Sequence, residues 1–209
     1  MKPGILTSFF FTFFLTVTCD VSGQIGLGGR TGIVFSTLTG SAYMPKPGFH
    51  AGLFFKAPVS DRLSFQPEII FVQRGGHTSL KDAEHFYNPY NQRMYRREKL
   101  TLDYLDLSLL FRYNITRGFY WLAGPKGSVL LQGMQRFTNG YRERQAYRFR
   151  DARNFDLALE LGIGVETKSG IVLGVRGDLG VVPISQIRQY HNLSLQATVG
   201  YVFLGKRRR

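Results

Sequence analysis

The feature that most constrains this chain is a strict alternation of apolar and polar residues along long segments. Between residues 154 and 166 the apolar residues stand two apart, and small, polar or acidic residues fill the positions between them. The apolar set is Phe155, Leu157, Leu159, Leu161, Ile163 and Val165. Successive side chains of a β-strand point to opposite faces, so this pattern predicts a strand with one apolar face and argues against a helix.

The same alternation recurs along the chain and predicts an all-β fold with eight strands. The predicted strands span residues 24–38, 48–58, 63–75, 100–114, 119–132, 153–167, 171–182 and 191–204. The connections at 59–62, 115–118 and 168–170 are short, whereas those at 76–99 and 133–152 are long. Tight turns at one end and longer loops at the other are typical of a transmembrane β-barrel. We therefore predict an eight-stranded antiparallel up-and-down barrel in a membrane.

Charged residues on the polar face indicate which face is enclosed. Six are basic and six are acidic: Arg30, Lys56, Arg74, Arg112, Lys126, Arg176, Glu68, Asp106, Asp156, Glu160, Glu166 and Asp178. An enclosed lumen needs this balance, because one unpaired buried charge costs several kcal/mol. The interior of an eight-stranded barrel is just wide enough for side chains to fill it. The pattern predicts small, polar and charged residues in a filled lumen and an apolar outer wall; the alternative is a secreted lipocalin-like barrel with its apolar face inward.

Aromatic residues gather near the predicted strand ends and suggest two girdles at the membrane interfaces. The turn-end set is Tyr113, Phe119, Trp121, Tyr201 and Phe203, and the loop-end set is Phe35, Phe49, Phe71, Tyr104, Phe155 and Tyr190. Amphipathic rings sit well at the boundary between lipid and water. The alternative is the ordinary preference of strands for aromatic residues.

The N-terminal segment predicts export. Lys2 precedes an apolar run over residues 5–17, which is followed by small and polar residues. Thirteen helical residues reach only about 20 Å, short of a bilayer core, so we predict a signal peptide over residues 1–23 and a barrel domain over 24–209. Lipid attachment at Cys19 is the weaker alternative, since Thr16-Val17-Thr18 lacks the residues that such a site presents.

Several segments resemble a known family of barrels. They are 48–52, 60–71 with its Gln66-Pro67-Glu68, 102–107, 119–125 and 155–164. The chain is similar in these segments to the PorT-like outer-membrane β-barrel family of Bacteroidota-type bacteria. The resemblance implies an eight-stranded barrel in the outer membrane of a Gram-negative cell, and its namesake takes part in protein secretion. Ser108 and the basic tail after Gly205 depart from the family pattern.

No constellation for catalysis or cofactor binding stands out. His77 and Ser79 lie together in the predicted 76–99 loop and would fit a barrel enzyme acting on lipid or peptide, but a plain polar loop explains them as well. His50 falls on the lumen face, where a packed, hydrogen-bonded histidine is expected. The single Cys excludes a Cys-based zinc site. The sequence therefore predicts a protein that is not an enzyme and holds no cofactor or metal.

The long loops are basic and point to binding. The chain carries 27 Lys and Arg against 14 Asp and Glu. Within the 133–152 loop, Arg142, Arg144, Arg148 and Arg150 alternate with aromatic residues, as a hairpin with one cationic face would. Arginine suits bidentate contact with phosphate, so we expect these four to contact outer-membrane lipid and lipopolysaccharide-like anions. Nucleic acid could use similar residues, but an exported chain does not meet it.

These observations together predict a non-enzymatic integral outer-membrane barrel. Its expected role is structural or in assembly, including protein secretion with proteins of the secretion machinery as partners. A surface binding protein or adhesin that uses the loops 76–99 and 133–152 is the second interpretation. The barrel enzyme is the third.

Overall fold

The computed structural model describes residues 25–39, 43–78, 97–139, 142–148, 153–183 and 190–205. The predicted signal peptide lies outside these ranges. The strands are β1 (Gly26–Thr39), β2 (Met44–Pro58), β3 (Leu63–His77), β4 (Arg97–Asn114), β5 (Phe119–Asn139), β6 (Arg142–Arg148), β7 (Phe155–Glu166), β8 (Ile171–Gly180) and β9 (His191–Leu204). No helix in the described part of the chain is long and apolar enough to cross a membrane.

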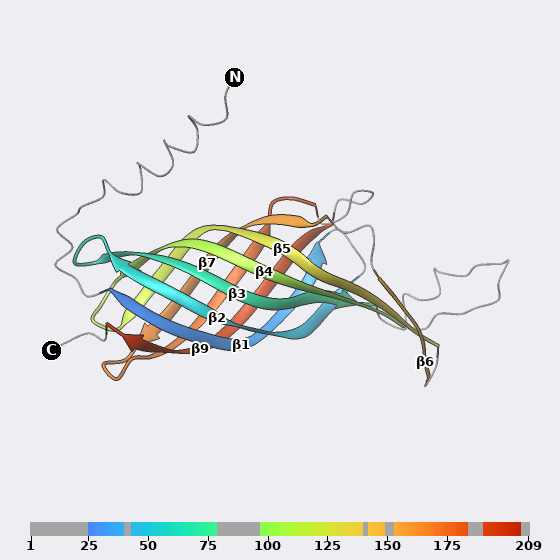
Figure 1. Cartoon of the computed structure of the whole chain (residues 1–209), viewed down its shortest axis with the longest axis horizontal. Coiled ribbons are helices and arrows are strands. Elements are labelled where there is room, and N and C mark those ends of the chain that lie inside the picture. The colour runs from blue at the N-terminus through green and yellow to red at the C-terminus, as the bar shows by residue number, and fades with distance from the viewer. Residues whose placement is uncertain are drawn as a thin grey trace, which may run out of the picture.

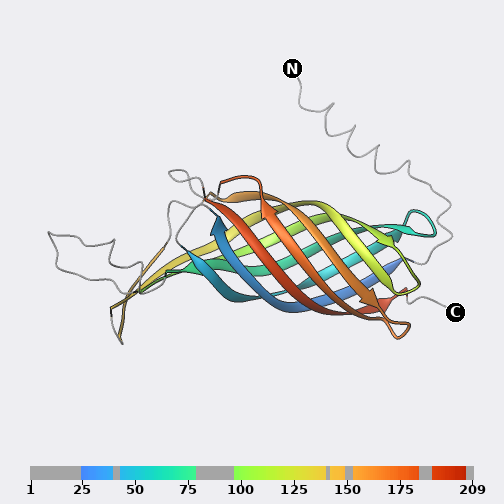
Figure 2. The same ribbon diagram turned by 180° about the vertical axis from the view of Figure 1, so that it is seen from behind.

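Eight of these strands close into a barrel. Going around the wall, the order is β4, β3, β2, β1, β9, β8, β7 and β5, and pairing of β5 with β4 closes the ring. Every pairing is antiparallel, and β6 pairs with β5 alone among the described strands. The strands wrap obliquely around a cylinder in Figure 1, and Figure 2 shows the opposite side of the same wall. The predicted eight-stranded antiparallel barrel is confirmed.

The two ends of the barrel differ. Tight turns at 59–62, 115–118 and 167–170 lie at one end, which we call the turn end, where Leu27 of β1 also pairs with Leu204 of β9. Gly170 has a φ of 93°, which suits a glycine in the last of these turns. The longer connections lie at the other end, the loop end, where β6 projects beyond the barrel (Figure 1).

The strand boundaries at the loop end differ from the prediction. β2 begins at Met44 although residue 48 was predicted, and β3 and β4 extend to His77 and Arg97, into the predicted 76–99 loop. β5 continues to Asn139 and forms a hairpin with β6, so much of the predicted 133–152 loop is strand. Strict alternation ends where a strand leaves the membrane, because the two faces no longer meet different solvents. Backbone pairing can continue without that signal.

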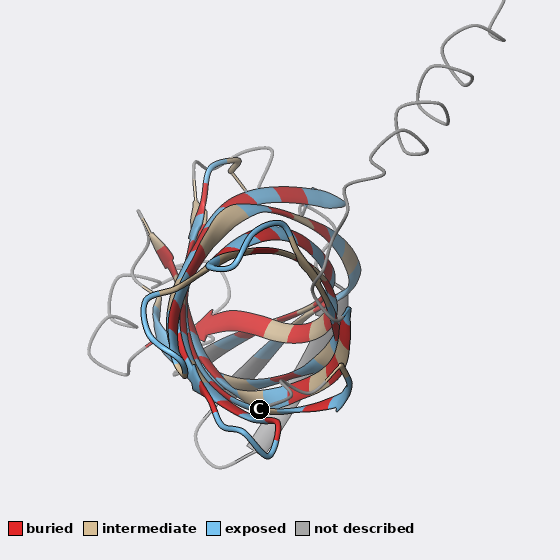
Figure 3. Cartoon of the chain, turned by 90° about the vertical axis from the view of Figure 1, so that its left-hand side faces the viewer, coloured by how far each residue is buried: buried red, intermediate tan, exposed pale blue. Residues whose placement is uncertain are grey.

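The apolar faces of the strands point outward and the polar faces point inward. On β7, Leu157, Leu159 and Leu161 are exposed, whereas Ala158 and Glu160 between them are buried, as is Asp156 before them. The same alternation of buried and exposed residues runs around the ring in Figure 3. An apolar wall of this kind suits lipid and would be costly in water, so the lipocalin-like alternative is wrong.

Apolar residues also lie within the lumen, on both sides of the central Arg30, Glu68, Glu160 and Arg176, which corrects the expectation of a wholly polar interior. The loop-end cluster consists of Val34, Leu38, Val72, Leu100, Leu102 and Tyr104. The turn-end cluster consists of Phe54, Leu110, Tyr120, Leu122, Val172 and Val202. The charged side chains between the two clusters are themselves buried, so the lumen is filled as predicted.

The aromatic girdles are confirmed only in part. Trp121 and Tyr201 are exposed at the turn end, as are Phe35 and Phe49 at the loop end. Tyr104 was assigned to the loop-end girdle, but its side chain is fully buried in the lumen. Tyr190 is also partly buried, against the loop-end cluster. Tyr104 faces the lumen because every second residue of a strand lies on the same face, and Leu102, two residues earlier, also faces the lumen.

Candidate functional site

The middle of the lumen holds a compact cluster of arginine and glutamate. Arg176 on β8 donates from Nη1 to Glu68 Oε2 at 2.9 Å and to Glu160 Oε1 at 2.8 Å, and from Nη2 to Glu68 Oε1 at 3.0 Å. Arg30 on β1 places Nη2 2.8 Å from Glu68 Oε2. All four side chains are buried. Charge-assisted hydrogen bonds therefore join four strands across the lumen.

A second cluster lies on the loop side of the first. Lys126 Nζ is 2.6 Å from Asp178 Oδ2, and Ser194 Oγ donates to the same oxygen at 2.6 Å. Arg74 forms an ion pair with Asp106. Asp156 differs, because its Oδ2 accepts a hydrogen bond from the Asn192 amide at 2.6 Å and no cation of the described chain forms an ion pair with it. This cluster thus holds three carboxylates against two cations.

A third cluster lies toward the turn end. Glu166 accepts from Lys56 Nζ at 2.8 Å and lies 2.6 Å from Arg112 Nη2. The Arg112 guanidinium stacks 3.7 Å from the centre of the Tyr120 ring, a favourable cation–π contact. This cluster holds two cations against one carboxylate.

All twelve charged residues predicted for the lumen lie there, so their predicted placement is confirmed. Lys46 is a further buried cation that the sequence analysis missed, because it fell in a predicted loop. The polar residues Asn192, Ser194 and Gln196 were also missed, although their alternation with Leu193 and Leu195 was a usable signal. The network joins the strands and offers no nucleophile paired with a base.

The predicted catalytic alternatives gain no support from geometry. His77 ends β3 and pairs with Lys99 of β4, whereas Ser79 lies outside the described residues. His50 is fully buried, and its Nε2 lies 3.3 Å from Thr198 Oγ1, as expected of a packed lumen histidine. Among the described residues, no group of three or more His, Cys, Asp or Glu could hold a metal ion.

The predicted binding residues fall on the hairpin at the loop end. Arg142, Arg144 and Arg148 lie on β6, while Arg150 lies outside the described residues. The hairpin is continuous with the barrel wall, because β5 pairs with β7 up to Val129 and with β6 from Met134 onward. The basic segment that was expected to form a loop is therefore partly a continuation of the barrel sheet.

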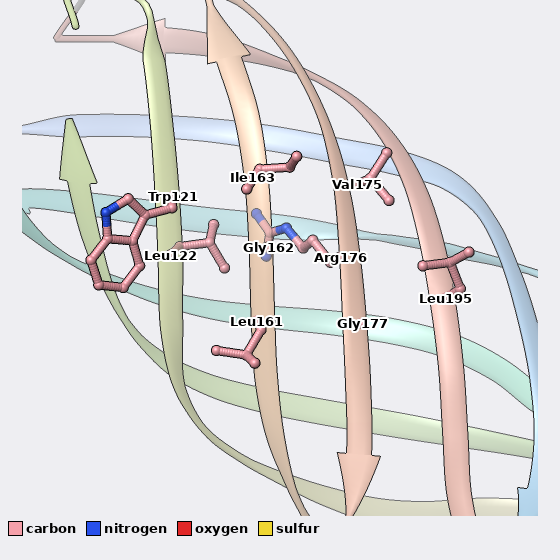
Figure 4. Close-up of a pocket in the computed structure, with 9 residues that line it drawn as sticks. All are labelled: Trp121, Leu122, Leu161, Gly162, Ile163, Val175, Arg176, Gly177 and Leu195. Atoms are coloured by element: carbon pink, nitrogen blue, oxygen red, sulfur yellow. The ribbon is translucent and has the colours of Figure 1, made fainter. Parts of the chain in front are cut away.

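A shallow depression marks the outer wall between β5, β7, β8 and β9 (Figure 4). Gly177 pairs with Leu161 on one side and Leu195 on the other, and its missing side chain leaves the hollow. Trp121 and Val175 belong to the same rim. The surrounding side chains are apolar except for Arg176, whose guanidinium binds the lumen glutamates, so this hollow offers no polar group for chemistry.

Comparison with known proteins places the chain in a family. The family model described as outer membrane protein beta-barrel domain matches residues 20–186. Among solved structures, the attachment invasion locus protein Ail of Yersinia pestis, in complex with the heparin analogue sucrose octasulfate, is 12% identical with a TM-score of 0.46, covering 87% of this chain and 99% of its own. Neisserial surface protein A is 10% identical with a TM-score of 0.47, covering 86% of this chain and 97% of its own.

No curated protein matches the sequence. The family match extends over most of the chain, and the structure behind it is a closed barrel with an apolar outer wall. The chain therefore belongs to the outer membrane protein β-barrel domain family and is an integral protein of the outer membrane.

Proposed function

We propose that this protein is a non-enzymatic barrel that anchors an anion-binding surface at its loop end. The observation that carries the proposal is the charge of the loop-end segments 40–46, 76–99, 132–154 and 181–191. They contain thirteen Lys and Arg against five Asp and Glu, an excess of eight positive charges. Even if every carboxylate there paired with a cation, a formal charge of plus eight would be left over.

The orientation of the barrel supports a role at the cell surface. Barrels of this class keep short turns on the periplasmic side and longer loops outside. With the turn end in the periplasm, the β5–β6 hairpin faces a surface rich in lipid phosphates and sugar acids. Arginine binds such groups bidentately, so lipopolysaccharide-like glycolipid is the ligand class that we assign to Arg142, Arg144, Arg148 and Arg150.

The test is a charge-removal variant with a matched control. Replacing Arg142, Arg144, Arg148 and Arg150 by Gln should weaken binding of the refolded protein to anionic glycolipid micelles, with the largest loss at low salt. Replacing the tail residues Lys206, Arg207, Arg208 and Arg209 by Gln removes the same formal charge and should change binding much less. Equal losses of binding in the two variants would mean that only the net charge of the protein matters. That result would overturn the assignment of the binding surface to the hairpin.

A second candidate function is a structural or assembly role in protein secretion. It is supported by the resemblance of residues 60–71 and 102–107 to the PorT-like family. Deleting the gene and comparing the proteins that reach the medium tests it, and an unchanged set of secreted proteins would contradict it. Protease treatment of intact cells tests the adhesin form of the first proposal, since cleavage in the loops should abolish attachment.

A further inference from the structure

Lys46 is a buried cation at the loop-end mouth of the barrel that lacks a carboxylate partner. Its residue is 4% exposed, and its Nζ donates to Thr101 Oγ1 at 2.9 Å. Within the described chain no Asp or Glu oxygen lies within 4.0 Å of this ammonium. By contrast, each remaining buried Lys or Arg has such an ion pair, namely Arg30, Arg74, Arg112, Lys126 and Arg176.

The surroundings of Lys46 are themselves basic. Lys99 of β4 lies directly opposite Arg136 of β5, two residues before Thr101. Both act electrostatically on Lys46, as does the carboxylate of Asp103, whose Oδ1 accepts from Gln73 Nε2 at 3.0 Å. Like charges directly opposite each other destabilise a sheet. The charged groups that act on Lys46 are thus two cations and one carboxylate, and His77 of β3 lies opposite Lys99.

An ammonium group has three donors, and Thr101 takes one of them. Burying a cation without a counter-charge is unfavourable, so the site favours an anion. The formal excess of eight positive charges in the loop-end segments makes the chain itself a poor source of that anion. An anion with several acceptor oxygens can take the remaining donors of Lys46, and Lys99 and Arg136 add positive charge that favours it.

We infer that the loop-end mouth binds a phosphate group, with Lys46 as its buried donor and Lys99 and Arg136 at its rim. The inference rests on the proposed function, because it names the chemical group that this surface recognises. It adds residues of the barrel wall to the hairpin arginines. A phosphate group occurs both in glycolipid headgroups and as the free ion, and both present the same oxygens to Lys46.

The test measures thermal unfolding of the refolded full chain in zwitterionic detergent, with phosphate or chloride at matched ionic strength. Phosphate should raise the wild-type midpoint, since a ligand that binds only the folded state stabilises it. Lys46→Met should weaken the apparent phosphate affinity about tenfold or more, whereas Lys46→Arg should stay within about threefold. Lys168→Met, at the exposed turn end, is the matched control and should respond as the wild type does.

This design separates the effect of the substitution on folding from its effect on phosphate binding. Lys46→Met keeps the apolar stem and removes an uncompensated charge, so its midpoint in chloride should equal or exceed that of the wild type. A wild type that ignores phosphate, or a Lys46→Met variant that responds fully, would overturn the site.

A second arm distinguishes the two sources of phosphate. Micelles of a phosphorylated glycolipid and of its dephosphorylated form are compared for binding to wild type and Lys46→Met. Preference for the phosphorylated form that is lost in Lys46→Met identifies the headgroup as the ligand, while a response to inorganic phosphate alone identifies the free ion. The hairpin variant with four Gln replacements reports on the proposed function separately, because it leaves Lys46, Lys99 and Arg136 in place.

Discussion

The middle of the lumen and the loop-end mouth handle positive charge in opposite ways. In the middle, Arg176 contacts both Glu68 and Glu160 within 3.0 Å. At the mouth, Lys46 meets a hydroxyl group, and Lys99 lies opposite Arg136. The chain thus neutralises its own charge in the middle of the lumen, whereas cations exceed carboxylates in the loop-end segments. Charge balance separates the part of the barrel that stabilises the fold from the part that we propose to bind anions.

The largest expected effect comes from breaking the central cluster. Glu68→Ala leaves Arg30 and Arg176 with one shared carboxylate, Glu160, and should lower the free energy of unfolding by about 3–5 kcal/mol. The measurement is urea unfolding of the protein in lipid vesicles. The folded fraction is read from the difference in gel migration between heated and unheated samples. Lys46→Ala removes a cation with no carboxylate partner and should cost less than about 1 kcal/mol. Equal losses would erase the contrast between the two regions.

A smaller effect sharpens the contrast within the lumen. Asp178→Asn removes the charge that Lys126 pairs with and should cost about 2–3 kcal/mol in the same unfolding measurement. Asp156→Asn should cost less than about 1 kcal/mol, since that carboxylate is held by the Asn192 amide alone. If the Asp156 variant were the more destabilised of the two, the assignment of partners in this cluster would be wrong.

The smallest effect concerns two wall glycines. A Cβ added at Gly124 would lie 2.1 Å from the Leu109 carbonyl oxygen, so Gly124→Ala should destabilise the barrel by about 1–3 kcal/mol. At Gly177, in the outer hollow, the nearest atom to an added Cβ is the Ser194 carbonyl oxygen at 3.9 Å. Gly177→Ala should therefore stay within about 0.5 kcal/mol of the wild type. A melting shift of equal size in both variants would show that the close approach at Gly124 relaxes.

The body of the fold could be predicted from the sequence, because each wall residue meets either lipid or lumen. That requirement imposes the period of two seen from Phe155 to Val165 and marks the lumen charges. The pairing of those charges could not be predicted, since Arg176 and Glu68 are 108 residues apart and meet through the stagger of the strands. Lys46 was missed because Pro45 and Pro47 on either side of it suggest a loop, although β2 runs through them.

The β5–β6 hairpin could be predicted only in part from the sequence. Alternation of the arginines with Tyr141, Tyr147 and Phe149 predicts a hairpin, but nothing in the sequence marks one of its strands as an extension of β5. The register of Met134 to Asn139 against β6 follows from backbone pairing beyond the membrane, where side-chain polarity no longer discriminates.

The length of β5 has a consequence for affinity. Its 21 residues span about 70 Å at the usual rise per residue, so one strand runs from the turn end to the loop-end hairpin. Under the proposed function, arginines carried on a paired strand lose less conformational freedom on binding than arginines in an unpaired loop would. The proposed contacts with a headgroup can then be individually weak and still give measurable affinity.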